Sequence, residues 1–377
     1  MTMPLIDYII NGMKSEKTNG RIYICHTYYH AYIAVVKELV RRKEDRERAD
    51  IVLSTMSNDF GSLKERLEDT GVFENVFMYD EKEDVTSPEV MKYHQDRGNI
   101  ALNLLQRIKY TKLLGQLQEQ YIPTDMTKYR DVYVFCDSDP IGYYLNYKKI
   151  PYHAIEDGLN SGRLDDQARN ANKGAWPLKK AMAALGLIFI ESGYSKYCID
   201  YEVNDISANH SVPKNTIEIP RQELNNRLSK EDHRILVDIF LPNSEKVLAQ
   251  LLGDSGAPGA KPNAMILTEP LCDMDVRAKM FRDIVKEYEN DYRIIIKPHP
   301  RDVLEYEKEF PAITVIKDKF PMEVLGDIDG FKVDKLISVI TQMENVYFAK
   351  EIVYLGLDFL DKYEDPSIHR KTELLDA

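Results

Sequence analysis

Short apolar runs alternate with segments of helical amphipathic spacing along most of the chain, the pattern of an α/β protein with parallel sheets. In the first half, apolar runs bounded by polar residues predict strands at 21–25, 50–54, 75–79, 131–136 and 152–155. Apolar positions at helical spacing predict helices at 31–42, 61–69 and 91–117. This order of elements predicts one doubly wound domain in the first half of the chain.

The middle of the chain is less regular than the segments before and after it. Residues 160–176 are polar and predict a loop or short helices, whereas 185–191 and 197–203 resemble strands. Glycine and proline are concentrated in 254–262, which predicts a linker or a loop. Beyond it the alternation resumes and predicts a helix at 276–288 and strands at 264–268, 293–297, 313–316, 335–340 and 351–355.

The linker candidate divides the chain into two predicted domains. We expect an N-terminal Rossmann-like domain at 1–255 and a C-terminal one at 256–377, facing each other. The length of 377 residues fits about two to three domains and allows large hydrophobic cores.

The charge and cysteine content narrow the possible classes of protein. With 50 Lys and Arg against 62 Asp and Glu, the net charge is −12, which argues against a nucleic-acid partner. The four cysteines have no zinc-site spacing and suggest a reducing compartment; they are Cys25, Cys136, Cys198 and Cys272.

The expected location is the cytoplasm. The first 20 residues lack a basic region followed by a long apolar run, so no signal peptide is predicted. No stretch approaches the ~18 consecutive apolar residues that a membrane-spanning helix needs. A peripheral contact with the inner face of a membrane stays open, although the basic residues of 37–48 are interleaved with acids and fit a solvated helix face better.

Several familiar catalytic patterns are missing from the sequence. It has no P-loop, no G-x-G-x-x-G after an expected strand, no H-E-x-x-H and no G-x-S-x-G. These absences argue against a nucleoside triphosphatase, a simple dinucleotide dehydrogenase, a zincin protease and an α/β-hydrolase.

An acidic pair directly follows the expected strand 152–155. Side chains at the carboxyl end of a parallel strand face the ligand crevice of an open α/β sheet, and Glu156 and Asp157 hold this position. Gly158 permits a sharp turn there, and a carboxylate in such a place can serve as general base on a hydroxyl group. An ordinary turn with solvated acids fits the same residues.

A second segment, Lys297-Pro298-His299-Pro300-Arg301, follows the expected strand 293–297. Two prolines restrict the backbone on either side of the histidine. A rigid imidazole beside Lys and Arg suits the binding of a phosphate, and it can protonate a leaving phosphate oxygen because its pKa lies near neutrality. A rigid turn with a capping histidine is the alternative, and we favour the functional interpretation.

His26 and His30 flank the turn after the first expected strand, which faces the same crevice. We place them on the acceptor side, although a structural role suits them as well. Their i, i+4 spacing resembles a metal pair, but no third ligand is evident nearby, and no metal site is predicted.

With these residues in view, the chain resembles bacterial sialyltransferases of glycosyltransferase family 52, the lipooligosaccharide and capsular type. It is also similar to the bacterial polysialyltransferases and the Pasteurella-type sialyltransferases. These families share an acidic-Asp-Gly motif, matched by 156–158, and a Lys-x-His-Pro motif, matched by 297–300. The resemblance implies an α/β fold of GT-B architecture, with two Rossmann-like domains facing across a cleft.

Two further segments agree with this resemblance. Residues 320–325 look like the F-x-E-V-L element of the family, in which the Glu, here Glu323, bonds the ribose of the cytidine nucleotide. The family also has a Ser/Thr pair that bonds the donor phosphate, and this sequence has Thr341 and Gln342 there, with Ser338 three residues earlier. Thr268, at the end of the expected strand 264–268, is assigned to the same donor site.

The resemblance implies an inverting transfer of a nonulosonic acid, most simply sialic acid, from a CMP-sugar to a glycan of surface polysaccharide or lipooligosaccharide. Asp157 takes the role of general base, with Glu156 as its orienting neighbour or as the base itself. His299 takes the role of general acid on the leaving CMP, and Lys297 and Arg301 neutralise its charge, so that no metal cofactor is needed.

Other functions stay open at this point. The amide of Gln342 in place of a hydroxyl keeps a UDP-sugar, CMP-Kdo or CDP-polyol donor in play, and also a non-catalytic GT-B-like partner protein. The expected partners are a nucleotide-sugar donor and a glycan acceptor. The acceptor sugar, the linkage and the oligomeric state are not decided by the sequence, although dimers are common in such families.

Overall fold

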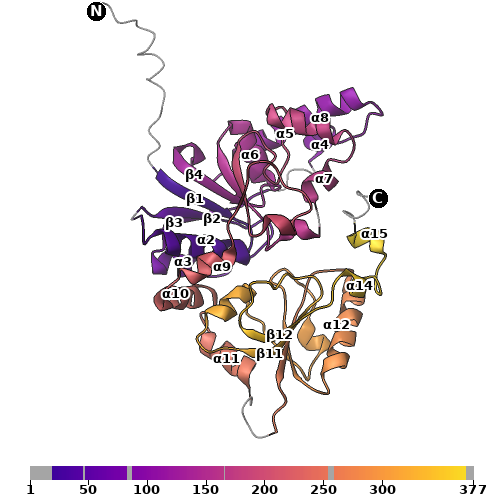
Figure 1. Ribbon diagram of the computed structural model, residues 1–377. Coiled ribbons are helices and arrows are strands. Elements are labelled where there is room, and N and C mark those ends of the chain that lie inside the picture. Colours follow the sequence, from indigo (N-terminus) through magenta and orange to yellow (C-terminus); the bar gives the residue numbers. More distant parts are fainter. Residues whose placement is uncertain (1–18, 46, 83–86, 165, 254–258, 371–377) are drawn as a thin grey trace, which may run out of the picture.

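The computed structural model describes residues 19–45, 47–82, 87–164, 166–253 and 259–370. Two parallel sheets, each with helices around it, lie one above the other along the long axis of the molecule (Figure 1). The predicted domain boundary between residues 255 and 256 lies outside the described residues.

The N-terminal sheet has seven parallel strands in the order β3-β2-β1-β4-β5-β6-β7. Its strands are β1 (Asn19–Cys25), β2 (Ala49–Ser54), β3 (Phe73–Tyr79), β4 (Tyr129–Phe135), β5 (Tyr152–Ile155), β6 (Cys198–Val203) and β7 (Thr216–Glu218). The helices in this part are α2 (Tyr28–Arg41), α3 (Leu63–Thr70), α4 (Pro88–Met91), α5 (Ile100–Gln118), η3 (Met126–Lys128), α6 (Pro140–Lys148), η4 (Ser161–Arg163), α7 (Gln167–Ala171), α8 (Trp176–Ala184) and η5 (Ile206–Ala208).

The C-terminal sheet has five parallel strands in the order β10-β9-β8-β11-β12. They are β8 (Asn263–Leu267), β9 (Arg293–Lys297), β10 (Thr314–Val315), β11 (Val333–Ser338) and β12 (Ala349–Tyr354). The helices here are α12 (Met274–Tyr288), α13 (Tyr306–Glu309), η6 (Met322–Asp327), α14 (Leu357–Leu360) and α15 (Pro366–His369). Two such sheets confirm the predicted α/β fold of GT-B architecture.

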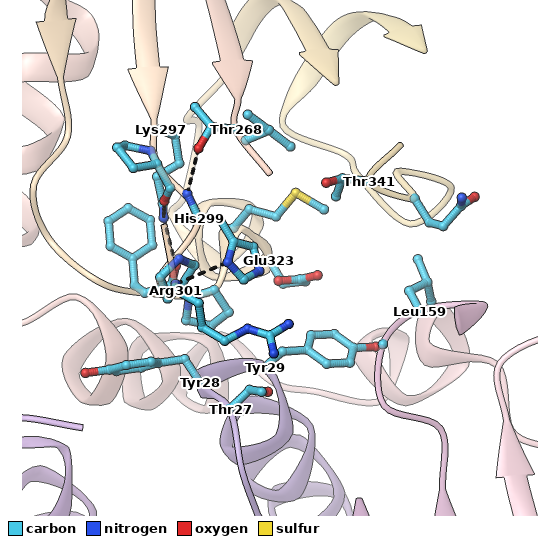
Figure 2. A pocket seen from close by; sticks show the side chains of 18 of the residues that line it. Thr27, Tyr28, Tyr29, Leu159, Thr268, Lys297, His299, Arg301, Glu323 and Thr341 are labelled. Carbon is cyan, nitrogen blue, oxygen red and sulfur yellow. Dashed lines mark hydrogen bonds between the residues drawn. The ribbon is translucent and has the colours of Figure 1, made fainter. Parts of the chain in front are cut away.

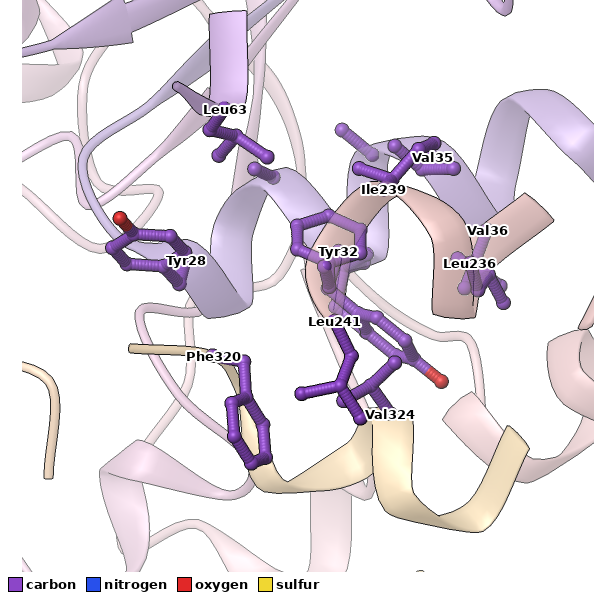
Figure 3. Packing of buried hydrophobic residues seen from close by; sticks show 14 of the residues in the cluster. Tyr28, Tyr32, Val35, Val36, Leu63, Leu236, Ile239, Leu241, Phe320 and Val324 are labelled. Carbon is purple, nitrogen blue, oxygen red and sulfur yellow. The ribbon is translucent and has the colours of Figure 1, made fainter. Parts of the chain in front are cut away.

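Three helices connect the sheets: α9 (Arg221–Asn226), α10 (Lys230–Phe240) and α11 (Ser244–Leu252). A capping box between Ser229 and Asp232 starts α10, which contacts α2 and α3 of the first sheet and η6 of the second. Their apolar side chains form one cluster, in which Phe320 and Val324 from the η6 region meet α2 and α10 (Figure 3). This shared core fixes the position of one sheet relative to the other.

Most predicted strands are confirmed, but the strand expected at 185–191 is wrong. The structure has α8 ending at Ala184 and then an irregular segment, whose Ile188, Phe189 and Ile190 are fully buried. These side chains enter two small clusters with α5 and α8, so they are apolar because they are buried and not because they pair in a sheet. A short apolar run does not distinguish these two cases.

The helix expected at 91–117 is interrupted. Gly98 has φ +67°, and Asn99 caps a new helix, with its side chain accepting hydrogen bonds from the backbone N–H groups of Ala101 and Leu102. The result is the short α4 and the long α5. Within the described part of the chain, no helix is long and apolar enough to cross a membrane.

Candidate active site

A cavity of about 250 Å³ lies between the two sheets, where residues that follow the carboxyl ends of strands from both domains meet. Figure 2 shows Thr268, His299, Glu323 and Thr341 on its C-terminal side, opposite Tyr28 and Tyr29. The predicted site residues that line it are Asp157, Gly158, Thr268, Lys297, Pro298, His299, Pro300, Arg301, Glu323, Thr341 and Gln342. The remaining predicted residues, His26, His30, Glu156 and Ser338, are buried and are not among its lining.

Asp157 presents a carboxylate to this cavity, and its side chain is 47% exposed. The Nε2 of His30 lies 3.0 Å from its Oδ1 and 2.6 Å from its backbone oxygen. The backbone N–H of His26 donates to Nδ1 of His30 at 3.1 Å, so the proton of a neutral His30 is on Nε2 and points at Asp157. Partial burial raises the pKa of Asp157, but the hydrogen bond from His30 and the charges of His30 and Arg301 outweigh it and lower the pKa to about 2.

His26 lies next to His30 and pairs with two other carboxylates. Its Nε2 lies 2.9 Å from Oε2 of Glu81 and 3.4 Å from Oδ2 of Asp139. Burial lowers the pKa of His26, but the two carboxylates prevail and raise it to about 9. His30 therefore orients Asp157, and His26 supports His30 through its backbone N–H. Neither side chain lines the cavity, although the sequence placed both there.

Glu156 points in the opposite direction from Asp157. Its side chain is fully buried, and its Oε1 accepts a hydrogen bond from the backbone N–H of Asn204 at 2.9 Å. Arg221 lies 3.7 Å away and also pairs with Glu202. Burial raises the pKa of Glu156 to about 7, and the Arg221 charge offsets this only in part. The geometry therefore makes Asp157 the carboxylate of this pair that a ligand can touch.

His299 sits on a rigid loop at the end of β9. Its backbone N–H donates to Oγ1 of Thr268 at 3.1 Å, and its Nδ1 accepts from the backbone N–H of Arg301 at 3.2 Å (Figure 2). The proton of the neutral ring is therefore on Nε2. Burial, reinforced by the charges of Arg301 and Lys297, lowers the pKa of His299 to about 4, so the ring is neutral when the cavity is empty.

A buried network supports this loop. Asp302 accepts hydrogen bonds from the hydroxyls of Thr268 at 3.0 Å and Tyr306 at 2.7 Å. Arg277 pairs with the other oxygen of Asp302 at 2.6 Å, and the Asp302 side chain is fully buried. Thr268 thus joins the His299 backbone to a fixed ion pair, and it acts through His299 as a positioning residue.

Replacing Thr268 with Val is expected to lower turnover about tenfold and the free energy of unfolding by about 1–3 kcal/mol. Valine keeps the shape of threonine but leaves the His299 N–H without its acceptor, and it removes one of the two hydroxyl hydrogen bonds to Oδ2 of Asp302. Turnover and thermal unfolding would be measured together. Thr70→Val is the control, because that hydroxyl also donates one hydrogen bond, to the Leu67 carbonyl, away from the cavity. Equal turnover in both variants would contradict the positioning role.

Lys297 and Glu323 line the cavity on its C-terminal side. The ammonium of Lys297 donates to the carbonyl oxygens of Phe320 at 2.9 Å and Pro298 at 3.2 Å. Burial lowers the pKa of Lys297 to about 8, although Glu323 acts in the opposite sense. Burial also raises the pKa of Glu323 to about 7. Lys297 therefore ties two loops together, while the carboxyl of Glu323 remains available to a ligand.

The loop after β11 carries a feature that sequence reasoning missed. Oε1 of the buried Glu269 accepts hydrogen bonds from the hydroxyls of Ser338 and Thr341, both at 2.8 Å. It also accepts from the backbone N–H groups of Val339, Ile340 and Thr341, at 3.1 to 3.2 Å. Ser338 is thereby used within the protein. The available signal was an acidic residue directly after an expected strand, the same position that drew attention to Asp157.

A second cavity of about 250 Å³ meets the first at Asp157. Its described lining is polar and contains no Lys or Arg. Hydroxyl groups dominate it, together with carboxyl and amide groups, and the polar residues are Asp137, Ser138, Ser161, Asp166, Gln167, Ser192, Tyr194, Tyr201, Asn209 and Ser211. Asp157 is thus placed between a cavity lined by cationic loops and one lined by hydroxyls. Among the residues that the structure describes, no three or more His, Cys, Asp or Glu side chains are grouped to hold a metal ion.

The family model of glycosyltransferase family 52 matches residues 78–341. An uncharacterized protein of Haemophilus influenzae is 24% identical over 139 residues, which cover 34% of this chain and 45% of that protein, so the match spans less than half of its length. The fold is similar to the GT-B domain of a sialyltransferase from Photobacterium damselae, with 14% identity, 86% of each chain covered and a TM-score of 0.49. It is also similar to UDP-GlcNAc 2-epimerase from Neisseria meningitidis bound to UDP-GlcNAc, with 10% identity, 85% and 78% coverage and a TM-score of 0.44.

Proposed function

Since the chain belongs to glycosyltransferase family 52, we propose that it is an inverting transferase that moves a nonulosonic acid, most simply sialic acid, from a CMP-sugar to a hydroxyl of a glycan. The product would be a surface polysaccharide or lipooligosaccharide. The observation that carries the proposal is the ionised carboxylate of Asp157 at the junction of two cavities. One cavity supplies cationic and hydroxyl groups for a nucleotide, and the other supplies partners for a sugar.

In the proposed reaction, the acceptor sugar binds in the polar cavity and its hydroxyl approaches Asp157. The carboxylate takes the hydroxyl proton while the oxygen attacks the anomeric carbon of the donor sugar. The bond from that carbon to the phosphate oxygen breaks, and CMP leaves with the electron pair. A single displacement of this kind inverts the anomeric configuration. His30 holds the carboxylate in place throughout the reaction.

His299 serves the leaving group. Among the residues that the structure describes, none accepts a hydrogen bond from the Nε2–H of His299, so this group can donate to a phosphate oxygen. The negative charge of the donor phosphate raises the pKa of a nearby imidazole, which favours the general-acid role. In that role Nδ1 would exchange the hydrogen bond from the Arg301 N–H for a proton, and Nε2 would pass its own proton to CMP.

The other proposed contacts with the donor are assigned from the residues that line the first cavity. Glu323 would accept hydrogen bonds from the ribose hydroxyls, and Thr341 and Gln342 would face the phosphate. Arg301 supplies a positive charge, because its side chain borders the cavity and it lowers the pKa of both Asp157 and His299. With this cation beside a monophosphate leaving group, the proposed step uses no metal ion.

A thermal-shift titration tests the donor class first. The protein would be heated with CMP, CDP, UMP, UDP or GDP, with and without Mg²⁺, and the shift in Tm recorded. A ligand present at ~100 times its Kd adds about 2.7 kcal/mol to the free energy of unfolding. We expect CMP to stabilise the protein selectively and without Mg²⁺, and CMP-sialic acid to support transfer. Selective stabilisation by UDP or CDP would contradict the assignment of a CMP-sugar as donor. No shift with any nucleotide would favour a non-catalytic binding role.

A further inference from the structure

One face of the N-terminal domain is both apolar and basic. Helices α5 and α8 pack against each other through a small cluster that includes Leu104 and Ile108 of α5 and Met182 and Ala183 of α8. They lie at the end of the molecule farthest from the C-terminal sheet (Figure 1). Six large apolar side chains on and next to these helices are 44% to 67% exposed: Ile100, Leu102, Leu105, Leu178, Leu185 and Leu187. We call this set, with the exposed lysines named below, the α5–α8 face.

The charge of the same segments is opposite to that of the whole protein. Residues 98–118 and 167–190 contain Lys and Arg but no Asp or Glu, within a chain whose net charge is −12. The exposed cations on them are Lys109, Lys112, Lys173 and Lys180. Such a local excess of positive charge in an acidic protein favours an anionic partner.

The single tryptophan of the chain lies on this face as well. Trp176 is half-buried at the start of α8, and the ammonium of Lys180 lies 5.2 Å from its ring centroid. Tryptophan and lysine both have an apolar body and a polar end, which suits them to the boundary between lipid and water. A protein surface that lies on a membrane without crossing it typically combines exposed leucines with lysines.

From these features we propose that the α5–α8 face docks on an anionic lipid bilayer. The leucines enter the headgroup region, and the lysines pair with lipid phosphates. A bilayer fits better than a protein partner because α5 and α8 carry lysines and no acidic residue of their own, and because the exposed apolar side chains are spread over two helices. The exposed Asp96, which accepts a hydrogen bond from Asn103 of α5, is an acidic residue beside them.

The position of this face suits a membrane-bound acceptor. Gln167, on α7 just before α8, and Tyr194 line the polar cavity beside Asp157. Tyr194 also packs on Trp176 at 5.2 Å and belongs to the cluster beneath the α5–α8 face. A glycan carried by a membrane lipid would therefore reach the cavity from the docked side. This last step rests on the proposed function, whereas the docking itself does not.

Vesicle co-sedimentation of the full chain tests the proposal. Vesicles of phosphatidylcholine and phosphatidylglycerol in equal parts are expected to bind the protein, and vesicles of phosphatidylcholine alone are expected to bind it about tenfold less or worse. Lys112→Glu with Lys180→Glu should lower binding to the anionic vesicles about tenfold or more. Lys279→Glu with Lys286→Glu, two exposed lysines of α12, makes the same change in net charge elsewhere and should alter it little.

A second pair of variants tests the apolar part. Leu178→Ser with Leu185→Ser should also lower vesicle binding about tenfold, because less apolar surface enters the lipid. Transfer to a soluble oligosaccharide should be unchanged in all these variants, so loss of docking and loss of enzymatic function are read separately. Equal binding to both vesicle types, equal effects of the two lysine pairs, or a dimer in solution that the leucine substitutions dissociate would overturn the proposal.

Discussion

Replacing Asp157 with Asn is expected to lower kcat by about 10³-fold while the Kd for CMP stays within about twofold. A positioned general base contributes on the order of 10²–10⁴ to the rate, and an amide at this position takes no proton from the acceptor hydroxyl. The side chain keeps its size, and His30 still has the backbone oxygen of residue 157 as a partner at 2.6 Å. Steady-state kinetics with saturating donor, together with CMP binding by calorimetry, would separate the two effects.

Glu156→Gln is the matched control for this substitution. Glu156 is the adjacent carboxyl, but it is buried against Asn204 and Arg221 and does not line the cavity. We therefore expect a modest loss of stability and a kcat within about tenfold of the parent value, because an amide oxygen still accepts the Asn204 hydrogen bond. If the Glu156 variant loses turnover and the Asp157 variant keeps it, the assignment of the base is wrong.

The pH profile of kcat separates the same two carboxyls. A general base works only when deprotonated, so the rate falls as the pH falls through its pKa. With a pKa of about 2, Asp157 stays ionised throughout the ordinary assay range, whereas Glu156, at about 7, would produce an acid limb near neutrality. Glu323 also titrates near 7, and its protonation is expected to raise the donor KM rather than lower kcat. A kcat limb near pH 7 that vanishes in Glu156→Gln would contradict the role of Asp157.

The positions of most strands along the chain and the two principal motifs could be predicted because each depends on local sequence. The runs that became β1, β5, β8 and β9 are short, apolar and bounded by polar residues. Residues that follow the carboxyl ends of parallel strands lie at one edge of the sheet. Asp157 after β5 and His299 after β9 therefore each lie at such an edge of their own sheet. The two edges face each other, so both residues line one cavity.

The partners of those residues could not be predicted in the same way. His30 contacts Asp157 across 127 positions of sequence, and the pairing depends on how α2 lies relative to the loop after β5. The sequence placed His30 in the crevice, but packing buried it, and burial turned a candidate ligand into a support. The same holds for Glu156, whose neighbour at the next position faces the opposite way. Local periodicity carries no information on such long-range contacts.

The last of the large effects concerns Glu269. Glu269→Ala is expected to lower the free energy of unfolding by about 3 kcal/mol and to raise the donor KM about tenfold. One carboxylate oxygen accepts five hydrogen bonds from the loop that contains Ser338 and Thr341. Alanine removes this acceptor, and the Ser338 hydroxyl can then turn to the Thr341 carbonyl at 3.2 Å. An unpaired buried donor costs about 1–3 kcal/mol, and relaxation of the loop recovers part of the sum. Thr341 and Gln342 border the cavity, so a looser loop weakens donor binding.

Glu269→Gln distinguishes a positioning role from a loss of fold. The amide oxygen can accept the same hydrogen bonds, and burial raises the pKa of Glu269 although the hydrogen bonds from Ser338 and Thr341 act in the opposite sense. We therefore expect the Gln variant to recover most of the stability and a donor KM within about threefold of the parent value. Thermal unfolding and donor titration of both variants would be compared.

Tighter binding of CMP by Glu269→Ala would assign a different role to this carboxylate. The loop donors that hold Glu269 are hydroxyl and backbone N–H groups, the kind that also bind phosphate. If the Ala variant folds and binds CMP more tightly than the parent, the carboxylate competes with the donor phosphate for these groups. Glu269 would then act as a plug that the donor displaces. Weaker binding by Ala and recovery by Gln would instead establish that the carboxylate shapes the loop that brings Thr341 and Gln342 to the cavity.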